Sequence, residues 1–230
     1  MLAILMVVTA LPMTVLTASA VDSYNGVPVR PLKITNSNYD ELGLKEKNFV
    51  GYYAIRNASE LYGFAEMVAE NPKVDEENIV ILNDIVINKD MSNPEYKWVP
   101  FSFSGNLEGN GCTVSGIWVD TGSFGYGGLF STVGYSSLTD NRTISGLTIA
   151  NSKIKSNYAA GAFAGALLGQ GYTVSNCRVE SDVTVETRVG YVGGFFGEIN
   201  SSYMYNFTRL NRFENCVMSG TGKSTSSGSH

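Results

Sequence analysis

Val114–Val119, which reads Val-Ser-Gly-Ile-Trp-Val, is the first of four copies of one short phrase in this chain. Each copy has an apolar residue, any residue, Gly or Asn, an apolar residue, any residue and an apolar residue; the later copies are Ile144–Ile149, Val174–Val179 and Phe213–Met218. The copies begin at positions 114, 144, 174 and 213, so the intervals are 30, 30 and 39 residues. A period of this length is typical of a solenoid, in which each repeat buries its apolar face against its neighbours.

A second signature precedes each of the last three copies of the phrase. It is rich in glycine and phenylalanine or leucine, and its copies are Gly127–Phe130, Gly161–Gly165 and Gly193–Gly197. A further short apolar element follows the phrase, as in Asp182–Val185. Three short strands and three turns per repeat of about 30 residues predict an all-β fold, a parallel β-helix solenoid.

Alignment of the four copies predicts which residues stack along the solenoid. Strands of adjacent turns lie about 4.8 Å apart, so equivalent positions form ladders. One predicted interior ladder contains Ile117, Leu147, Cys177 and Cys216, and the other contains Val119, Ile149, Val179 and Met218. Cys177 and Cys216 are then close enough for a disulfide, but in-register side chains point the same way, so a disulfide and a reduced apolar stack both remain open.

One amphipathic helix is predicted over residues 58–70. Leu61, Phe64 and Val68 repeat at helical spacing and give it one apolar face. Asn57 can cap its start together with Glu60, a variant of the capping box. We expect this helix to cover the open N-terminal end of the solenoid, because an end without a cap exposes apolar surface.

Composition excludes several classes of function. The net charge is −5 and the basic residues are scattered, which gives no electrostatic footprint for nucleic acid. The single histidine is His230, the last residue, so no histidine-based triad or HExxH zinc site can form within the domain. We therefore expect no metal and no cofactor. Three cysteines do not make a disulfide framework.

The chain divides into four predicted segments. Residues 1–20 are apolar, end in Ala-Ser-Ala and predict a cleaved secretory signal peptide, although no Lys or Arg precedes the apolar core; the alternative is an uncleaved membrane anchor. Residues 21–48 are a lead-in segment, and residues 49–219 are the β-helix with its N-terminal cap. Residues 220–230 are rich in Gly, Ser and Thr and predict a flexible tail or linker to further domains. A mature chain without a membrane span follows if the signal is removed.

These motifs resemble the GLUG-type repeats of bacterial surface proteins. The resemblance rests on Tyr53–Ala65, Leu82–Ile85, Phe103–Gly111 and the Gly-Gly-Leu-Phe and Ser-Asn-Cys elements, and it covers about residues 50–219. The chain departs from the family at Glu108, where Asp is usual, and at Cys112, where His is frequent. The resemblance implies a right-handed parallel β-helix, secreted or displayed at the cell wall, which accompanies IgA-peptidase-like and wall-associated domains and has no established activity of its own.

An enzymatic alternative depends on outward carboxylates. Polysaccharide lyases and hydrolases need at least two acids that converge on one face, usually with a basic residue. The alignment places Asp120 and Glu180 at equivalent outward positions two turns apart, and it groups Arg178, Glu180 and Asp182 on one strand face. Such a trio is more often an ordinary ion-paired surface, so we assign no catalytic residue.

The loop between the second signature and the phrase varies most, and it is nine residues longer in the last repeat. Aromatic residues and one arginine in these loops predict a binding ridge on one edge of the solenoid: Tyr135, Tyr172, Tyr203, Tyr205, Phe207 and Arg209. Ring faces pack on sugars and on protein partners, so the ridge predicts a glycan or a host or cell-wall protein as partner; the alternative is that these rings fold back onto the core. The sequence therefore favours an extracellular, non-catalytic scaffold or adhesin-like module over a carbohydrate-active enzyme.

Overall fold

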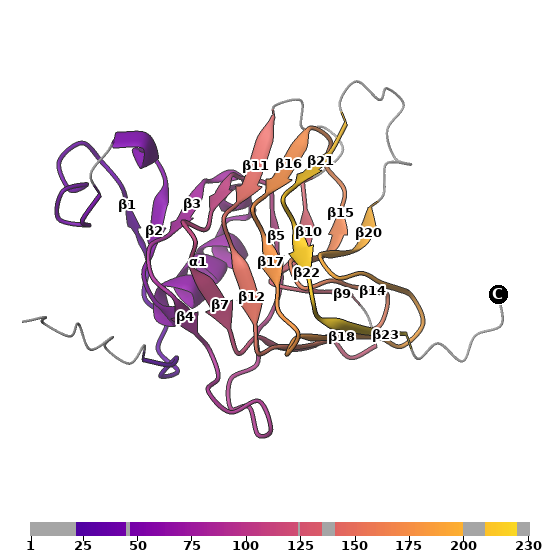
Figure 1. Cartoon of the computed structure of the whole chain (residues 1–230). Helices are drawn as coiled ribbons and strands as arrows, with labels where there is room; N and C mark the ends of the chain where they lie inside the picture. Colours follow the sequence, from indigo (N-terminus) through magenta and orange to yellow (C-terminus); the bar gives the residue numbers. More distant parts are fainter. Residues whose placement is uncertain (1–21, 45–46, 124, 135–140, 200–209, 225–230) are drawn as a thin grey trace, which may run out of the picture.

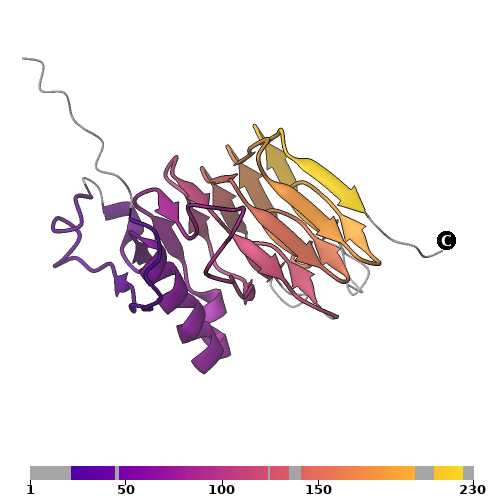
Figure 2. The same cartoon turned by 90° about the horizontal axis from the view of Figure 1, so that it is seen from below.

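The computed structural model describes residues 22–44, 47–123, 125–134, 141–199 and 210–224, and these residues form the predicted all-β, right-handed parallel β-helix with one α-helix (Figure 1). The strands line up in five sheets that run along the solenoid axis. We number these sheets 1 to 5 in the order in which a complete turn passes through them. Consecutive turns stack side by side from the first described strands to the last (Figure 2).

Sheet 1 contains β1 (Leu32–Lys33), β2 (Tyr53–Ile55), β3 (Ile79–Ile81), β6 (Leu107–Glu108), β11 (Arg142–Ser145), β16 (Tyr172–Ser175) and β21 (Arg212–Glu214). Sheet 2 contains β4 (Ile85–Val86), β7 (Thr113–Ser115), β12 (Thr148–Ala150), β17 (Arg178–Val179) and β22 (Val217–Met218). Sheet 3 contains β8 (Trp118–Asp120), β13 (Lys153–Ser156), β18 (Thr184–Thr187) and β23 (Thr221–Ser224). Sheet 4 contains β9 (Tyr126–Gly127), β14 (Ala159–Ala160) and β19 (Tyr191–Val192), and sheet 5 contains β5 (Phe101–Phe103), β10 (Phe130–Val133), β15 (Ala164–Leu167) and β20 (Phe196–Ile199).

A complete turn has five strands, so the prediction of three was wrong. The turns β6 to β10, β11 to β15 and β16 to β20 each give one strand to every sheet. All strand pairs are parallel except β1 with β2. The region around the glycine-rich signature accounts for the difference, because a two-residue strand of sheet 4 comes at or just before each copy and a separate strand of sheet 5 begins within it.

Residues with positive φ make the corners between the short strands. Gly146, Asn176 and Asn215 occupy the corner between sheets 1 and 2, with φ of 65°, 53° and 51°. Gly116 and Asn151 occupy the next corner, between sheets 2 and 3, with φ of 75° and 41°. Glycine and asparagine are the residues that reach this conformation at least cost. Both corners therefore require the same Gly or Asn between apolar positions.

Because both corners hold Gly or Asn between apolar residues, the phrase fits either corner, and the predicted register of its first copy is wrong. The last three copies are in register as predicted, since Ile144 pairs with Val174 and Val174 with Phe213. The first copy is one strand further along its turn, because Val114 pairs with Ile149. The residue that precedes Ile144 in the stack is Leu107.

The predicted interior ladders change accordingly. Val119 pairs with Ile154 in sheet 3, and not with Ile149. The Thr113–Thr148 pairing places Cys112 beside Leu147, the position predicted for Ile117. The interior ladder at this corner is therefore Cys112, Leu147, Cys177 and Cys216.

The predicted helix is confirmed as α1 (Ala58–Glu70). Asn57 caps it, since its side chain accepts a hydrogen bond from the backbone N–H of Glu60 at 3.0 Å. The Glu60 carboxylate accepts from the backbone N–H of Arg56 at 2.7 Å, one residue before the position of a standard capping box. Leu61, Phe64 and other buried residues of the helix join the same apolar core as the strands, so α1 closes the N-terminal end of the solenoid.

Two predicted segment boundaries move. The lead-in segment is part of the fold, because β1 pairs with β2 and Ile34 is buried against Ala54 and Val80. Two 3-10 helices, η1 (Lys47–Phe49) and η2 (Pro72–Glu76), complete this end. At the other end β23 pairs with β18, so the solenoid continues to Ser224, beyond the predicted end at residue 219. The predicted signal peptide, residues 1–20, lies outside the described residues.

Candidate functional site

The structure contradicts part of the predicted binding ridge. Tyr172 is fully buried in β16 and belongs to the apolar core, so it cannot line an exposed ridge. Its backbone N–H donates to Asn211 Oδ1 at 2.9 Å, which fixes it between two turns. Tyr135, Tyr203, Tyr205, Phe207 and Arg209 lie outside the described residues.

The predicted outward carboxylates do not converge. Glu180 forms an ion pair with Arg178 at 3.6 Å. Asp182 accepts a hydrogen bond from the backbone N–H of Asn151 at 2.8 Å, which supports the positive-φ corner. Asp120 pairs with Lys155 in sheet 3, so it is not equivalent, as predicted, to Glu180, which directly follows β17 of sheet 2. Each carboxylate has a local structural role.

The corner between sheets 3 and 4 instead gathers polar and aromatic side chains from several turns. Two buried hydroxyl groups shape it: Ser156 donates to Ala159 O at 2.8 Å, and Thr187 donates to Gly190 O at 3.0 Å. These bonds close a tight reversal after β13 and β18. A Cβ atom at Gly190 would lie 1.5 Å from Tyr158 O, so only glycine lets these turns stack so closely.

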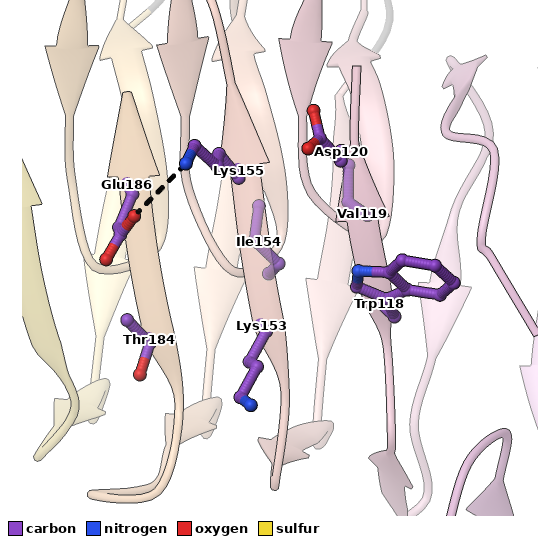
Figure 3. Close-up of a pocket in the computed structure, with 8 residues that line it drawn as sticks. All are labelled: Trp118, Val119, Asp120, Lys153, Ile154, Lys155, Thr184 and Glu186. Atoms are coloured by element: carbon purple, nitrogen blue, oxygen red, sulfur yellow. Dashed lines mark ion pairs between the residues drawn. The ribbon is translucent and has the colours of Figure 1, made fainter. Parts of the chain in front are cut away.

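One edge of this corner carries a ladder of alternating charge. The outward side chains of Asp120, Lys155 and Glu186, the charged ladder, lie on β8, β13 and β18 in direct register (Figure 3). Lys155 Nζ lies 4.0 Å from Glu186 Oε2. Trp118, Lys153 and Thr184 line the same shallow depression two positions earlier on each strand, on the same face of the sheet.

Arg188 links the first and last turns of the charged ladder. It follows β18, yet its guanidinium reaches Asp120 at 3.1 Å and also donates to Gly122 O. The backbone N–H of Gly122 and then the Arg188 guanidinium lower the pKa of Asp120. Asp120 is therefore an ionised structural anchor at neutral pH, which is the wrong protonation state for a general acid.

The other edge of the corner carries three tyrosines on consecutive turns. We call Tyr126, Tyr158 and Tyr191 the tyrosine ladder. The ring centroids of Tyr126 and Tyr158 are 5.3 Å apart, and those of Tyr158 and Tyr191 are 5.8 Å apart. Tyr158 is 42% exposed and Tyr191 is 55% exposed. None of the three belongs to the apolar core cluster.

Sequence reasoning missed this ladder, although a signal was present. Tyr126, Tyr158 and Tyr191 recur 32 and 33 residues apart, one to three residues before each copy of the glycine-rich signature. That period follows the solenoid turn. Loop length does not reveal this ladder, because the tyrosines lie before the glycine-rich signature and not in the variable loop that follows it.

The cysteines are free thiols in the described structure. Cys177 is buried, and burial raises the pKa of its thiol to about 12. Its Sγ lies 3.2 Å from Ser175 O. The reduced apolar stack is therefore the state that the structure shows. Within the described residues, no group of three His, Cys, Asp or Glu side chains could hold a metal ion, and no helix is long and apolar enough to cross a membrane.

Comparison with known proteins shows no family for this chain. No family model matches it, and no solved structure matches it. A stretch of 100 residues is 34% identical to part of Halomucin from Haloquadratum walsbyi; the match covers 44% of this chain and 1% of Halomucin. The fold is that of a β-solenoid, an architecture that fits a surface scaffold or a binding module.

Proposed function

We propose that this chain is a secreted or surface-displayed β-helix module of GLUG type, which acts as a non-catalytic scaffold or adhesin-like binding domain. The observation that carries the proposal is the corner between sheets 3 and 4, where exposed tyrosines lie beside a charged ladder. An exposed aromatic row is costly in water and is the kind of surface that a partner covers.

Three further points support the proposal. The similarity to part of Halomucin supports an extracellular setting. The carboxylates that an enzyme would use each have a structural partner in the described structure, as Asp182 does with the Asn151 N–H. A solenoid with rigid stacked turns also presents repeated side chains at fixed spacing, which suits binding to a repetitive partner.

The test compares binding with turnover on the same protein. The chain is screened on a glycan array and against cell-wall fractions, and in parallel it is incubated with anionic and neutral polysaccharides. Retention without release of product is expected. Release of unsaturated or reducing oligosaccharide that disappears in Asp182→Ala and in Glu180→Gln, with unfolding midpoints unchanged, would replace the scaffold by a lyase or hydrolase.

A further inference from the structure

We propose that the tyrosine ladder is a platform for an extended, uncharged polysaccharide chain that lies parallel to the solenoid axis. This inference rests on the proposed binding function and names its site and its ligand class. It does not involve the predicted loop ridge.

The ladder is built into the repeat rather than formed by chance contact of loops. The backbone N–H of Tyr158 donates to Gly125 O at 3.2 Å, and that of Tyr191 donates to Tyr158 O at 2.8 Å. Ala159 pairs with both Tyr126 and Tyr191, so a small residue stands in the middle turn at the position that holds tyrosine in its neighbours. In the middle turn the ring comes from Tyr158, the residue directly before Ala159, and it lies between the rings of Tyr126 and Tyr191.

The exposure of these rings is unusual within this protein. Most large aromatic side chains of the described part are buried or half-buried, including Trp98, Phe103 and Phe130. Among the residues that the structure describes, the exposed aromatic side chains are those of Tyr158, Tyr191 and Phe213, and Phe213 lies in the last described turn of sheet 1. Two of these three therefore lie next to each other on one corner.

The geometry favours sugar rings over a flat apolar partner. Successive turns repeat about every 4.8 Å, which is close to the length of one hexose unit in an extended chain. Neighbouring rings are inclined by 75° and 81°, so ring faces alternate with ring edges along the axis. Such faces can pack on the C–H surfaces of pyranose rings.

The neighbouring charges favour an uncharged ligand. Asp120, Lys155 and Glu186 alternate in sign along the same corner, and Arg188 is held by Asp120. This arrangement supplies hydrogen-bond donors and acceptors for hydroxyl groups, but it offers no block of one sign for a polyanion or polycation.

The experiment measures co-sedimentation of the full chain with insoluble cellulose, chitin and β-1,3-glucan, and retention on alginate as the charged probe. Wild type is compared with the double variant Tyr158→Ala/Tyr191→Ala and with Phe213→Ala, which removes an exposed aromatic ring elsewhere. We expect wild type to bind an uncharged polymer, the double variant to lose at least tenfold in affinity, and Phe213→Ala and Tyr158→Phe/Tyr191→Phe to retain binding. Urea midpoints verify that all variants are folded.

The outcomes separate this inference from the proposed function. Equal binding by wild type and the double variant overturns the ladder as the site and leaves the binding function standing. Binding only to alginate or to a cell-wall protein overturns the ligand class. Absence of binding to every polysaccharide and every cell-wall fraction overturns both.

Discussion

Gly116 tests whether close contact between turns selects glycine. Gly111 serves as its control, because it shares the backbone conformation of Gly116 but has no such contact. Gly116 has φ of 75° and Gly111 has φ of 77°. A Cβ atom at Gly116 would lie 2.1 Å from Asn88 O, whereas a Cβ atom at Gly111 would meet nothing within 4 Å. The two alanine variants share the backbone strain and the change in the unfolded chain, so their difference reports the contact alone.

Asn88 cannot move aside cheaply. It is 4% exposed, and its side-chain amide donates to Tyr96 O and Gly116 O, both at 2.8 Å. Its Oδ1 accepts from the backbone N–H groups of Glu95 at 2.9 Å and Tyr96 at 2.8 Å. Displacement of Asn88 by the new methyl group therefore breaks several buried hydrogen bonds, each of which contributes about 1 kcal/mol.

The expected losses follow from these terms. A non-glycine residue in the left-handed region costs about 1–2 kcal/mol, so Gly111→Ala should lower the free energy of unfolding by that amount. Gly116→Ala adds at least two broken hydrogen bonds and should lower it by about 3–4 kcal/mol. Urea titration followed by tryptophan fluorescence measures both, since Trp98 and Trp118 are joined by a backbone hydrogen bond near this corner. Equal losses for the two variants would refute the claim that turn-to-turn contact selects glycine at position 116.

Three other predictions concern the core, the charged ladder and the thiols. Ile149→Ala should cost about 2–5 kcal/mol in urea titration, because Ile149 is fully buried; Met218→Ala, at the paired position of the last turn, should cost below about 1 kcal/mol because Met218 is 52% exposed. Because the pKa of Asp120 is lowered in the folded state, its carboxylate stabilises the fold at pH values above the ordinary carboxyl range, and this stabilisation is lost as pH falls through the lowered pKa. Asp120→Asn should therefore be less stable than wild type at pH 7, by less than about 1 kcal/mol for so exposed a pair. The difference in stability should disappear in urea titrations at strongly acidic pH. Iodoacetamide at pH 8 should label Cys177 only after unfolding, since burial keeps its thiol protonated; mass spectrometry that finds native labelling of Cys177 as fast as in urea would contradict the buried stack.

The sequence determined the fold class, the capping helix and the register of most turns. These follow from local rules: apolar residues alternate with polar ones, and Gly or Asn stands wherever a corner needs positive φ. Asn57 and Glu60 likewise predict the start of α1, because a helix cap is formed by residues within one turn of each other in the sequence.

Only the tertiary structure decided which corner each phrase occupies and which side chains meet on the surface. Val114–Val119 and Ile144–Ile149 satisfy the same local rule at different corners, and their register depends on pairing with strands that are distant in sequence. Tyr172 is buried and Tyr158 exposed for the same reason, since the face that a side chain takes depends on how the five sheets close around the core. Local pattern fixes the shape of a corner, and pairing between turns fixes which residues gather there.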